Sequence, residues 1–456
     1  MVFSTDDVLS CTRGRLIAGP GTAWYSSVGC DSRTAPSGSL FFALKGAHAD
    51  GHQFVADAIA RGAAGAVVAH PPSGPLHQAD IIACEDPLIA LGALATWCLN
   101  KANVARVAVT GSAGKTTTKE MTARVLAARH QVLSTPENYN TEIGVPLTAC
   151  SISPDRDVFV AEMAMRGAGQ IGYLSRVVRP QVAVITNVGR SHISLLGSRD
   201  AIRQAKLEIC EGLDGGTLWL PVEDPALVAS ARERNVTVRT FGFLKAADVR
   251  ATQVRIQPDG ATRFRVTVGD ARSAATLRLL GRHFVANALA AIGVGDSLGV
   301  PLEDACAALA EIAPAPHRGE LLPGPNQSMI LDDTYNANPE AVLAALRSAA
   351  DWPAAGRRLV LFGDMLELGP AAEESHREVG AAAARLGFDW LGALGEFAPL
   401  VVAGAAQAGL THTAAFRTKE EAVSFLQSAL RPGDLLLIKG SRATQMEVVT
   451  VALATR

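Results

Sequence analysis

A glycine-rich turn between a strand-like and a helix-like stretch holds the residues best suited to chemistry. It reads Thr-Gly-Ser-Ala-Gly-Lys-Thr-Thr over residues 110–117. A helix start presents backbone N–H groups and the positive end of the helix dipole, and here Lys115 adds a charge and Thr116 a hydroxyl that can bind Mg²⁺. These groups suit the phosphates of a nucleoside triphosphate. The match to the P-loop pattern G-x-x-x-x-G-K-[ST] is incomplete, because Val109 stands where the pattern has its first glycine. The stretch could therefore also be an ordinary strand-to-helix turn.

Three ionisable side chains further along the chain could serve a metal ion beside this turn. Glu162 ends an apolar run, where a carboxylate could reach Mg²⁺, although a solvated helix start has the same appearance. His192 follows the strand-like residues 182–186 and could be a metal ligand, or a buried or capping histidine. Lys206 lies in an amphipathic helical pattern, and the pattern alone predicts that its side chain is exposed to solvent.

The composition is that of a globular protein with enough apolar residues for several cores. The 456 residues are 48% hydrophobic and 19% charged, and 42 Lys and Arg against 44 Asp and Glu give a formal charge of −2. This average charge gives no reason to expect nucleic acid or an anionic membrane as a partner. The 7 cysteines form no C-x-x-C pair and indicate free thiols. We find neither a signal peptide nor an apolar run near the ~20 residues of a membrane span, and expect a cytoplasmic protein without membrane insertion.

The order of strand-like and helix-like stretches predicts an α/β protein of three domains, as the length also suggests at roughly 150 residues per domain. Residues 1–102 alternate short strands and helices and form a small α/β domain. Residues 103–313 form a central P-loop mononucleotide-binding α/β domain, with further strands expected at 248–268 and 276–280. A stiff Pro-Ala-Pro linker opens residues 314–456, whose repeated strand–helix units predict a Rossmann-like, doubly wound domain. Its strands are expected at 329–332, 358–362, 390–394 and 434–438.

Polar loops next to the expected strands supply further candidate ligand groups. In the first domain Asp31, Ser32 and Arg33 precede a strand and Lys45 follows it, an arrangement that could hold a phosphorylated ligand or form ordinary polar turns. Asn138 and Asn140 lie in a polar turn before a helix of the second domain. The strand-end loops of the third domain hold Asp333, Asn336, Asn338, Asp364, Glu367, Lys439, Ser441 and Arg442.

These motifs resemble those of the Mur ligases of peptidoglycan synthesis, and within them the branch that adds D-alanyl-D-alanine to UDP-N-acetylmuramoyl-tripeptide. The resemblance covers nearly the whole chain, and its most specific parts are the block Asp-Asp-Thr-Tyr-Asn-Ala-Asn-Pro at 332–339 and the methionine-containing loop at 363–369. The Asp-Asn-Pro-Arg element of the sister ligase that adds diaminopimelate or lysine is not found. The family's glycine turn is the variant G-x-x-G-K-[ST]-[ST], which accounts for Val109.

The resemblance implies a role for each candidate residue. The ATP phosphates would be bound by Gly111, Ser112, Ala113, Gly114, Lys115, Thr116 and Thr117. Asn287 would lie near adenine, Arg318 near the γ-phosphate and Asp333 near the ribose. Mg²⁺ would be held by Thr116, Glu162 and His192. Lys206 matches a lysine that several of these enzymes carry as a carbamate, and Lys115, Glu162, His192, Lys206 and Arg318 would be the catalytic set.

The same resemblance assigns the substrates to the domains. The first domain would bind the UDP end of the sugar-peptide through Asp31, Ser32, Arg33 and Lys45, and Asn138 and Asn140 would contact that substrate in the second domain. The third domain would place the dipeptide through Asn336, Asn338, Asp364, Glu367, Lys439, Ser441 and Arg442. We expect a monomer that closes its third domain over the second to assemble the site and exclude water.

The implied reaction is an ATP-dependent amide ligation through an acyl phosphate. Three alternatives remain: another amide ligase of the superfamily, such as one acting on folate, a P-loop protein that uses nucleotide as a switch, and a non-catalytic muropeptide-binding module. The chain also departs from the usual family pattern at three places. Phe284 follows His283 where asparagine is usual, and Ala164 replaces a common glycine. The usual Gly-Asn-x-Asn-Asn stretch reads Glu-Asn-Tyr-Asn-Thr at residues 137–141, ending in Thr141.

Overall fold

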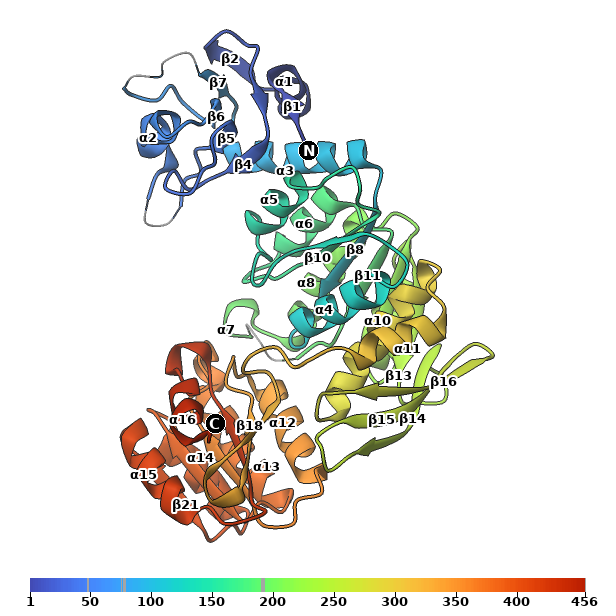
Figure 1. Cartoon of the computed structure of the whole chain (residues 1–456), viewed down its shortest axis with the longest axis vertical. Helices are drawn as coiled ribbons and strands as arrows, with labels where there is room; N and C mark the ends of the chain where they lie inside the picture. Colours follow the sequence, from blue (N-terminus) through green and yellow to red (C-terminus); the bar gives the residue numbers. More distant parts are fainter. Residues whose placement is uncertain (47–48, 75, 77–78, 190–192, 456) are drawn as a thin grey trace.

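The computed structural model describes residues 1–46, 49–74, 76, 79–189 and 193–455. It contains three α/β domains that follow one another along the chain, so the predicted fold class is confirmed (Figure 1). The first domain lies at one end, the central domain in the middle and the third domain at the other end. All seven cysteines are free thiols, as expected. Among the described residues, no helix is long and apolar enough to cross a bilayer.

The first domain is built on a sheet of strand order β2–β7–β6–β5–β4, in which only β2 runs antiparallel to its neighbour. Its inner strands are continuous apolar runs because both faces of a mainly parallel sheet are covered. The elements of this domain are β1 Phe3–Ser4, α1 Thr5–Thr12, β2 Arg15–Ala18, β3 Trp24–Tyr25, β4 Ser27–Gly29, β5 Ser39–Phe42, η1 Gly51–Phe54, α2 Val55–Ala60, β6 Gly65–Val68, β7 Asp80–Ala83 and α3 Pro87–Ala102.

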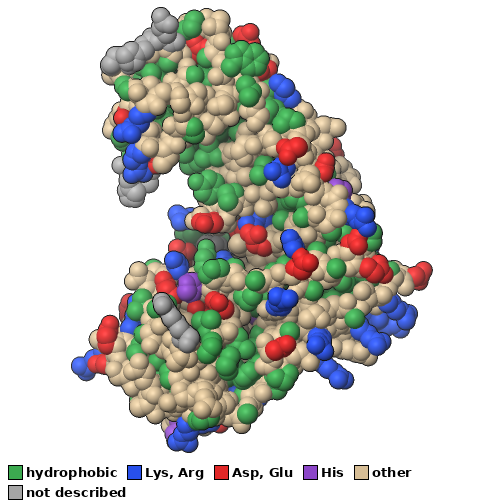
Figure 2. Space-filling model, in the orientation of Figure 1, with side chains coloured by type: hydrophobic (Ala, Val, Ile, Leu, Met, Phe, Trp, Pro, Cys, Tyr) green, Lys and Arg blue, Asp and Glu red, His purple; other side chains and the backbone are tan. Residues whose placement is uncertain are grey.

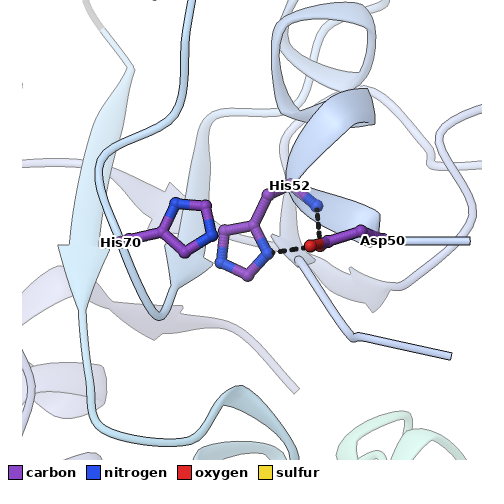
Figure 3. A group of neighbouring side chains, drawn as sticks. All are labelled: Asp50, His52 and His70. Atoms are coloured by element: carbon purple, nitrogen blue, oxygen red, sulfur yellow. Dashed lines mark hydrogen bonds and ion pairs between the residues drawn. The ribbon is translucent and has the colours of Figure 1, made fainter.

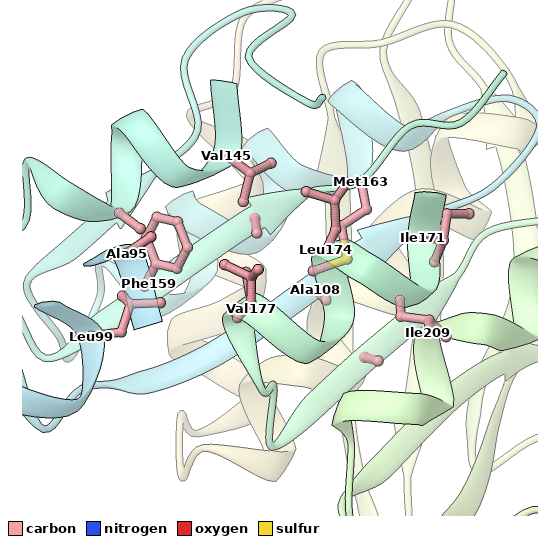
Figure 4. Packing of buried hydrophobic residues seen from close by; sticks show 14 of the residues in the cluster. Ala95, Leu99, Ala108, Val145, Phe159, Met163, Ile171, Leu174, Val177 and Ile209 are labelled. Carbon is pink, nitrogen blue, oxygen red and sulfur yellow. The ribbon is translucent and has the colours of Figure 1, made fainter. Parts of the chain in front are cut away.

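Helix α3 joins the cores of the first two domains. Asp86 caps its start by accepting the N–H groups of Leu88 and Ile89, and Asn103 ends it in the left-handed conformation. Its buried residues belong to one apolar cluster that runs from Leu40 and Val67 of the first sheet to Phe159 of the central sheet. Figure 4 shows Ala95 and Leu99 of α3 against Phe159 and Val145. The first domain is therefore packed directly onto the central one.

The central sheet has the order β16–β15–β14–β13–β12–β11–β8–β10–β9, parallel from β9 to β14 and antiparallel from β14 to β16. Its elements are β8 Ala105–Thr110, α4 Lys115–Leu126, β9 Val132–Ser134, α5 Gly144–Cys150, β10 Val158–Glu162, α6 Gln170–Val178, β11 Val182–Ile185, α7 Ile193–Leu196, α8 Arg199–Leu207, η2 Glu208–Gly212, β12 Thr217–Pro221, α9 Pro225–Arg232, β13 Thr237–Gly242, β14 Val249–Ile256, β15 Thr262–Val268, β16 Ala271–Leu277, α10 Arg282–Ser297 and α11 Leu302–Ala310.

Strand β8 lies between β10 and β11, and this neighbourhood positions the site. The glycine loop follows β8, Glu162 ends β10, and Thr186 follows β11. Carboxyl ends of parallel strands meet at one edge of a sheet, where α/β proteins bind ligands. Two expectations are wrong in detail. Residues 248–268, predicted as one strand, form β14 and β15 joined by a turn, and β16, predicted at 276–280, begins at Ala271 and ends at Leu277.

The third domain has the sheet order β17–β18–β22–β19–β20–β21, parallel except for β17. Strands β18, β22 and β19 are neighbours, so the loops that follow them, at 333–338, 440–442 and 363–368, lie together at one edge. The elements are β17 Glu320–Pro323, η3 Pro325–Gln327, β18 Met329–Asp332, α12 Pro339–Asp351, β19 Arg358–Phe362, η4 Gly369–Ala371, α13 Ala372–Arg385, β20 Trp390–Leu394, α14 Ala398–Gln407, β21 Thr413–Phe416, α15 Lys419–Ala429, β22 Leu435–Lys439, η5 Arg442–Thr444 and α16 Glu447–Leu453.

Candidate active site

Both glycines of the loop are required by their surroundings. Gly111 has φ +152°, and a Cβ there would lie 1.8 Å from Thr186 Oγ1. Gly114 has φ +78°, and its Cβ would lie 2.8 Å from Asn287 Oδ1. Gly114 is also the N-cap of α4, whose first N–H groups have no partner within the helix. Val109 lies inside strand β8, paired with Glu162 and Val184, and no glycine is needed at that position.

The residues after β11 hold the loop in place. Thr186 Oγ1 and Asn187 Nδ2 both donate to the carbonyl of Ala113, at 2.6 and 2.9 Å. Asn187 Oδ1 accepts the N–H of Ala113 at 3.0 Å, and Ser112 Oγ accepts the N–H of Gly189 at 2.9 Å. Thr186 and Asn187 are absent from the predicted site residues, although both follow a buried strand and belong to the stretch Ile185-Thr-Asn187 that contributes to the family resemblance.

Lys115 lies among the charged groups of the site. Its Nζ donates to the carbonyl of Gly111 at 2.9 Å. Burial lowers the pKa of Lys115, the Glu162 carboxylate opposes this shift, and the Arg318 guanidinium adds to it. Three residues of the predicted catalytic set therefore act on one another electrostatically. Phosphoryl oxygens entering here would meet two cationic side chains and the α4 N-terminus.

Glu162 is 1% exposed and keeps one carboxylate oxygen without a donor. Its Oε1 accepts Asn140 Nδ2 at 2.8 Å, and its backbone N–H donates to Thr135 Oγ1 at 3.0 Å. Within the described part of the chain, Oε2 is buried and has no hydrogen-bond partner. A buried carboxylate oxygen of this kind needs a cation or a donor, and carboxylate oxygen is a ligand that Mg²⁺ prefers. The residues present therefore fit Mg²⁺, with Asn140 orienting the carboxylate.

The expectation that Lys206 is exposed is wrong, because α8 turns this residue inward and its side chain is 2% exposed. Burial lowers the pKa of Lys206 well below its usual value, and the charge of Lys115 lowers it further. Burial and the neighbouring charge therefore both favour the neutral amine. Position 192, where a metal-binding histidine is predicted, lies outside the described residues.

A cavity of about 330 Å³ opens beside the start of α4. Thr116 and Thr117 line it together with Arg318 and with the apolar side chains of Met121 and Phe284. A mainly apolar slot that also has charged side chains of both signs in its lining, next to a phosphate-binding helix start, suits a nucleotide base. Asn287, predicted near adenine, is 8% exposed and lies beneath Gly114, where it supports the loop.

A second hollow, of about 340 Å³, lies between the glycine loop and the third domain. It brings together residues predicted separately from the second and third domains. They are Ser112, Lys115, Asn336, Asn338, Glu367, Ser441 and Arg442, with Ala337, Leu366, Leu368 and Ala443 completing the lining. The hollow therefore has a phosphate-binding loop on one side and amides, a hydroxyl and a guanidinium on the other.

Lys439, predicted to contact substrate, is instead committed to the loop after β18. The side chain is 3% exposed. Its ammonium donates to Asp333 Oδ2 at 2.5 Å and to the carbonyls of Asp333 and Asn336 at 3.1 and 2.9 Å. An ammonium has three N–H donors, and these contacts use them all. Lys439 fixes the loop and the predicted ribose ligand Asp333, whose pKa is raised by burial and lowered in part by Lys439.

Three other predicted substrate residues also serve the protein's own backbone. Asp364 accepts the N–H groups of Glu396 and Phe397 at 2.8 and 3.1 Å. Asn338 caps α12 by accepting an N–H at 2.9 Å. Ser441 Oγ accepts the N–H of Leu366 at 2.9 Å and donates to a carbonyl. Asn338 and Ser441 line the hollow as well as bonding to the backbone, whereas Asp364 does not line it.

Tyr335 is a site residue that the sequence did not reveal. Its ring lies beneath the guanidinium of Arg318 and also near that of Arg442. Arg318 lines the base cavity and Arg442 the second hollow, so one aromatic ring contacts a residue of each. Its presence within the 332–339 block was visible in the sequence, but its contact with both arginines depends on the fold.

The predicted residues of the first domain lie apart from this centre. Arg33 forms a two-point ion pair with Asp31, at 2.7 and 2.9 Å, on an exposed turn. Ser32 is 5% exposed and Lys45 is exposed. Asn138 is exposed on the loop before α5. Figure 2 shows the surface hollowed between the first and third domains, with the central domain at its back. A long substrate could reach across this hollow.

A cluster of Asp50, His52 and His70 in the first domain has the composition of a metal site but serves as a clamp (Figure 3). His52 Nδ1 lies 2.7 Å from Asp50 Oδ1, and His52 Nε2 accepts the N–H of Ala69 at 2.8 Å. The proton is therefore on Nδ1, and both ring nitrogens are used. His70 stacks on His52 at 4.0 Å. The cluster ties the start of η1 to the end of β6.

Three family models match successive parts of the chain. The Mur ligase family catalytic domain matches residues 25–140, the Mur ligase middle domain residues 109–295, and the Mur ligase glutamate ligase domain residues 317–442. These three matches together extend over most of the chain.

Relatives and solved structures agree with the family models. The UDP-N-acetylmuramoyl-tripeptide–D-alanyl-D-alanine ligase of Bacillus subtilis (strain 168) is 33% identical over 92% of this chain and 92% of its own, and that of Escherichia coli (strain K12) is 33% identical over 94% and 93%. The structure of MurF from Acinetobacter baumannii is 31% identical with a TM-score of 0.89 over 99% and 98% of the two chains. MurF from Thermotoga maritima in complex with ADP is 27% identical with a TM-score of 0.83 over 93% and 96%. The chain therefore belongs to the Mur ligase family, in the group that includes MurF.

Proposed function

We propose that this chain is an ATP-dependent ligase that joins D-alanyl-D-alanine to UDP-N-acetylmuramoyl-tripeptide and releases ADP and phosphate. The product would be the pentapeptide precursor of peptidoglycan. The observation that carries the proposal is the hollow in which Ser112 and Lys115 of the glycine loop face Asn336 and Arg442 of the third domain. A phosphate-binding loop and a group able to bind a carboxylate lie on opposite walls of one reaction space.

In the first step a carboxylate oxygen of the tripeptide attacks the γ-phosphorus of ATP, and the bond to ADP breaks. Negative charge spreads over the transferring phosphoryl oxygens. Lys115, Arg318 and the first N–H groups of α4 would stabilise that charge. The base would occupy the cavity lined by Met121 and Phe284. The N–H groups need no rearrangement during the step, because Thr186 and Asn187 already fix the loop.

Glu162 and Thr116 would hold Mg²⁺, which when bound neutralises phosphate charge and orients the transferring group. Asn140 keeps Glu162 Oε1 in place and leaves Oε2 for the cation. Lys206 would react as the neutral amine with CO₂, forming an N–C bond and releasing one proton, to give a carbamate. The reaction turns a potential cation beside Lys115 into an anion, which suits a site that collects Lys115, Arg318 and Mg²⁺.

In the second step the free amine of D-alanyl-D-alanine attacks the acyl carbon, and the tetrahedral intermediate expels phosphate as the amide forms. Arg442 would bind the terminal carboxylate of the dipeptide, since a guanidinium and a carboxylate match in shape and charge. Asn336 Oδ1 accepts the N–H groups of Ala337 and Arg442 at 2.9 and 3.4 Å, which orients the start of this loop. The third domain therefore presents the amine to the loop that activates the carboxylate.

The first domain would hold the UDP end of the sugar-peptide, and the exposed cationic side chains of Arg33 and Lys45 would bind its phosphates. Because this domain packs onto the central one through α3, the two ends of the substrate would be bound at a fixed separation. We propose that the chain acts as a monomer in the cytoplasm, where ATP and UDP-linked precursors are available.

A panel of amine acceptors tests this assignment. The purified chain is supplied with ATP, Mg²⁺ and UDP-N-acetylmuramoyl-tripeptide, and then with D-alanyl-D-alanine, D-alanine, diaminopimelate or L-glutamate. Mass spectrometry should find an amide product with the dipeptide and none with the three single amino acids. A product formed with one of the single amino acids and none with the dipeptide would contradict the assignment.

A further inference from the structure

The outer face of the antiparallel extension β14–β16 carries an unusual concentration of arginines. Alternation places Phe264, Val266 and Val268 of β15 in the core, beneath α10 and α11, and the residues between them on the outside. We call the outward arginines of the three strands the arginine face; its members are Arg250, Arg255, Arg263, Arg265 and Arg272. Figure 2 shows Lys and Arg side chains gathered over this part of the surface, which Figure 1 labels β14–β16.

The strand register places these arginines close together in three rows. In one row Thr267 of β15 is paired with Arg250 on one side and with Arg272 on the other. In the next row Arg265 is paired with Thr252. Beyond the bulge in β14, Arg255 is directly opposite Arg263. Directly opposed side chains lie about 5 Å apart at Cβ, and like charges there are destabilising.

No acidic side chain compensates this charge. Among the residues that the structure describes, no carboxylate forms an ion pair or hydrogen bond with any member of the arginine face. Elsewhere on the surface the chain pairs its arginines readily, as in Arg61 with Asp57 and Arg239 with Asp296. A net charge of −2 for the whole chain therefore conceals a strongly basic local surface.

Part of the face is hollowed. A depression of about 450 Å³ is lined by Arg250, Arg265 and Arg272 with the hydroxyls of Thr252 and Thr267, and its lining includes no acidic residue. Guanidinium and hydroxyl donors around a shallow depression are suited to phosphate oxygens. The face extends past the depression to Arg255 and Arg263, so one small phosphorylated molecule would leave two arginines uncompensated.

We propose that the arginine face binds the phosphate groups of an anionic phospholipid bilayer and attaches the chain peripherally to a membrane surface. The face is a sheet with several rows of cations, which matches an extended surface bearing many phosphates. Its outward positions carry arginine, threonine and alanine, and no aromatic side chain on which unpaired bases could stack, as single-stranded nucleic acid would require. Apart from the short side chain of alanine, no apolar group projects from these positions, so the attachment is electrostatic and needs no insertion.

Sedimentation with lipid vesicles tests the proposal on the full chain. Vesicles of phosphatidylcholine with about 30% phosphatidylglycerol have an anionic surface and should bind the chain at low salt. Vesicles of phosphatidylcholine alone should not bind it. High salt should release it, since exposed charges are screened. The triple variant Arg263→Gln, Arg265→Gln, Arg272→Gln should bind roughly a hundredfold more weakly, because each basic residue near an anionic surface contributes about fivefold.

A matched control distinguishes the effect of losing the arginine face from the effect of changing the net charge. Arg232→Gln, Arg385→Gln, Arg417→Gln changes three exposed arginines outside the face and should sediment as the wild type does. Both triple variants should keep ligase activity, which reports that they are folded. Equal sedimentation of the two variants would overturn the proposal. So would vesicle binding that is independent of phosphatidylglycerol, or binding of duplex RNA that is tighter than vesicle binding and is lost in the face variant.

Discussion

The guanidinium of Arg318 lies over the ring of Tyr335, 3.7 Å from its centroid. The same ring lies 5.7 Å from the guanidinium of Arg442. Cation–π contacts fix the plane of an arginine without using its N–H donors, which stay available for a ligand. Tyr335 thereby orients the arginine proposed for the γ-phosphate and, more weakly, the arginine proposed for the dipeptide carboxylate.

Tyr335→Leu should raise KM for ATP by about three- to tenfold, because a partly buried cation–π contact contributes about 1 kcal/mol. The KM for D-alanyl-D-alanine should rise less, since Arg442 is farther from the ring. Tyr335→Phe keeps the ring and should behave as the wild type in both. Steady-state kinetics with each substrate varied would measure this. If Phe were as damaging as Leu, the hydroxyl and not the ring would be the functional part.

Gly114→Ala should raise KM for ATP by at least about tenfold and reduce stability. The positive φ costs about 1 kcal/mol for alanine, and the new Cβ would displace Asn287 from beneath the loop. Gly215→Ala is a matched control, because φ is +74° there and nothing lies within 4 Å of the added Cβ. The control should lose stability to a similar extent with ATP binding intact. Identical KM values in the two variants would refute the steric account of the loop.

Lys206→Met should abolish ligation and, in CO₂-depleted buffer at pH 7, raise the melting temperature. The pKa of the amine, usually 10.5, is lowered well below that value in the folded chain, so between the lowered pKa and pH 10.5 the unfolded chain binds a proton that the folded chain does not. The stability of the wild type therefore increases with pH within this range. The methionine variant has no ionisable group at this position, so its stability does not carry the cost of keeping Lys206 unprotonated. The difference in melting temperature should shrink between pH 7 and pH 10. Wild-type activity should fall on CO₂ depletion and return with bicarbonate, and activity indifferent to CO₂ would exclude the carbamate.

Acid should weaken the contact between the second and third domains at His283. Its Nδ1 lies 3.1 Å from Ser348 Oγ on α12, and burial lowers its pKa from 6.5 to about 3, with Lys439 contributing. The histidine is neutral in the folded chain and protonated in the unfolded chain between these values, so stability is lost as pH falls below 6.5. The slope attributable to this group is at most about 1.4 kcal/mol per pH unit. Urea unfolding of His283→Gln between pH 7 and 4.5 should show a shallower slope than the wild type, and parallel curves would contradict this.

The strands of the third domain were largely predictable from the sequence. Met329–Asp332, Arg358–Phe362 and Trp390–Leu394 coincide with the predicted runs, because each is apolar throughout and bounded by polar residues. The residue pattern predicts no element between β20 and β22, where α14, β21 and α15 lie. α14 and β21 are rich in alanine, a residue that gives only a weak burial pattern. The turn at Asp259-Gly260 was likewise overlooked within a run read as one strand.

The residue types of the candidate site were easier to predict than their contacts. Pattern alone placed Lys206 in solvent because a polar position on an amphipathic helix usually faces water, whereas α8 turns this face toward Lys115. Lys439 and Asp364 were correctly seen at strand ends. Only the fold shows that Lys439 binds a carboxylate and two carbonyls of the neighbouring loop and that Asp364 accepts two backbone N–H groups, since a sequence does not specify which loop a strand-end side chain will meet.

The central claim is that the chain couples ATP cleavage to amide formation with a dipeptide acceptor. Phosphate release should be measured with ATP, Mg²⁺, UDP-N-acetylmuramoyl-tripeptide and D-alanyl-D-alanine, omitting each component in turn. We expect sustained release only in the complete mixture, and its loss in Lys115→Ala. Phosphate release that continues unchanged without D-alanyl-D-alanine, or a complete mixture that yields no pentapeptide product, would contradict the account.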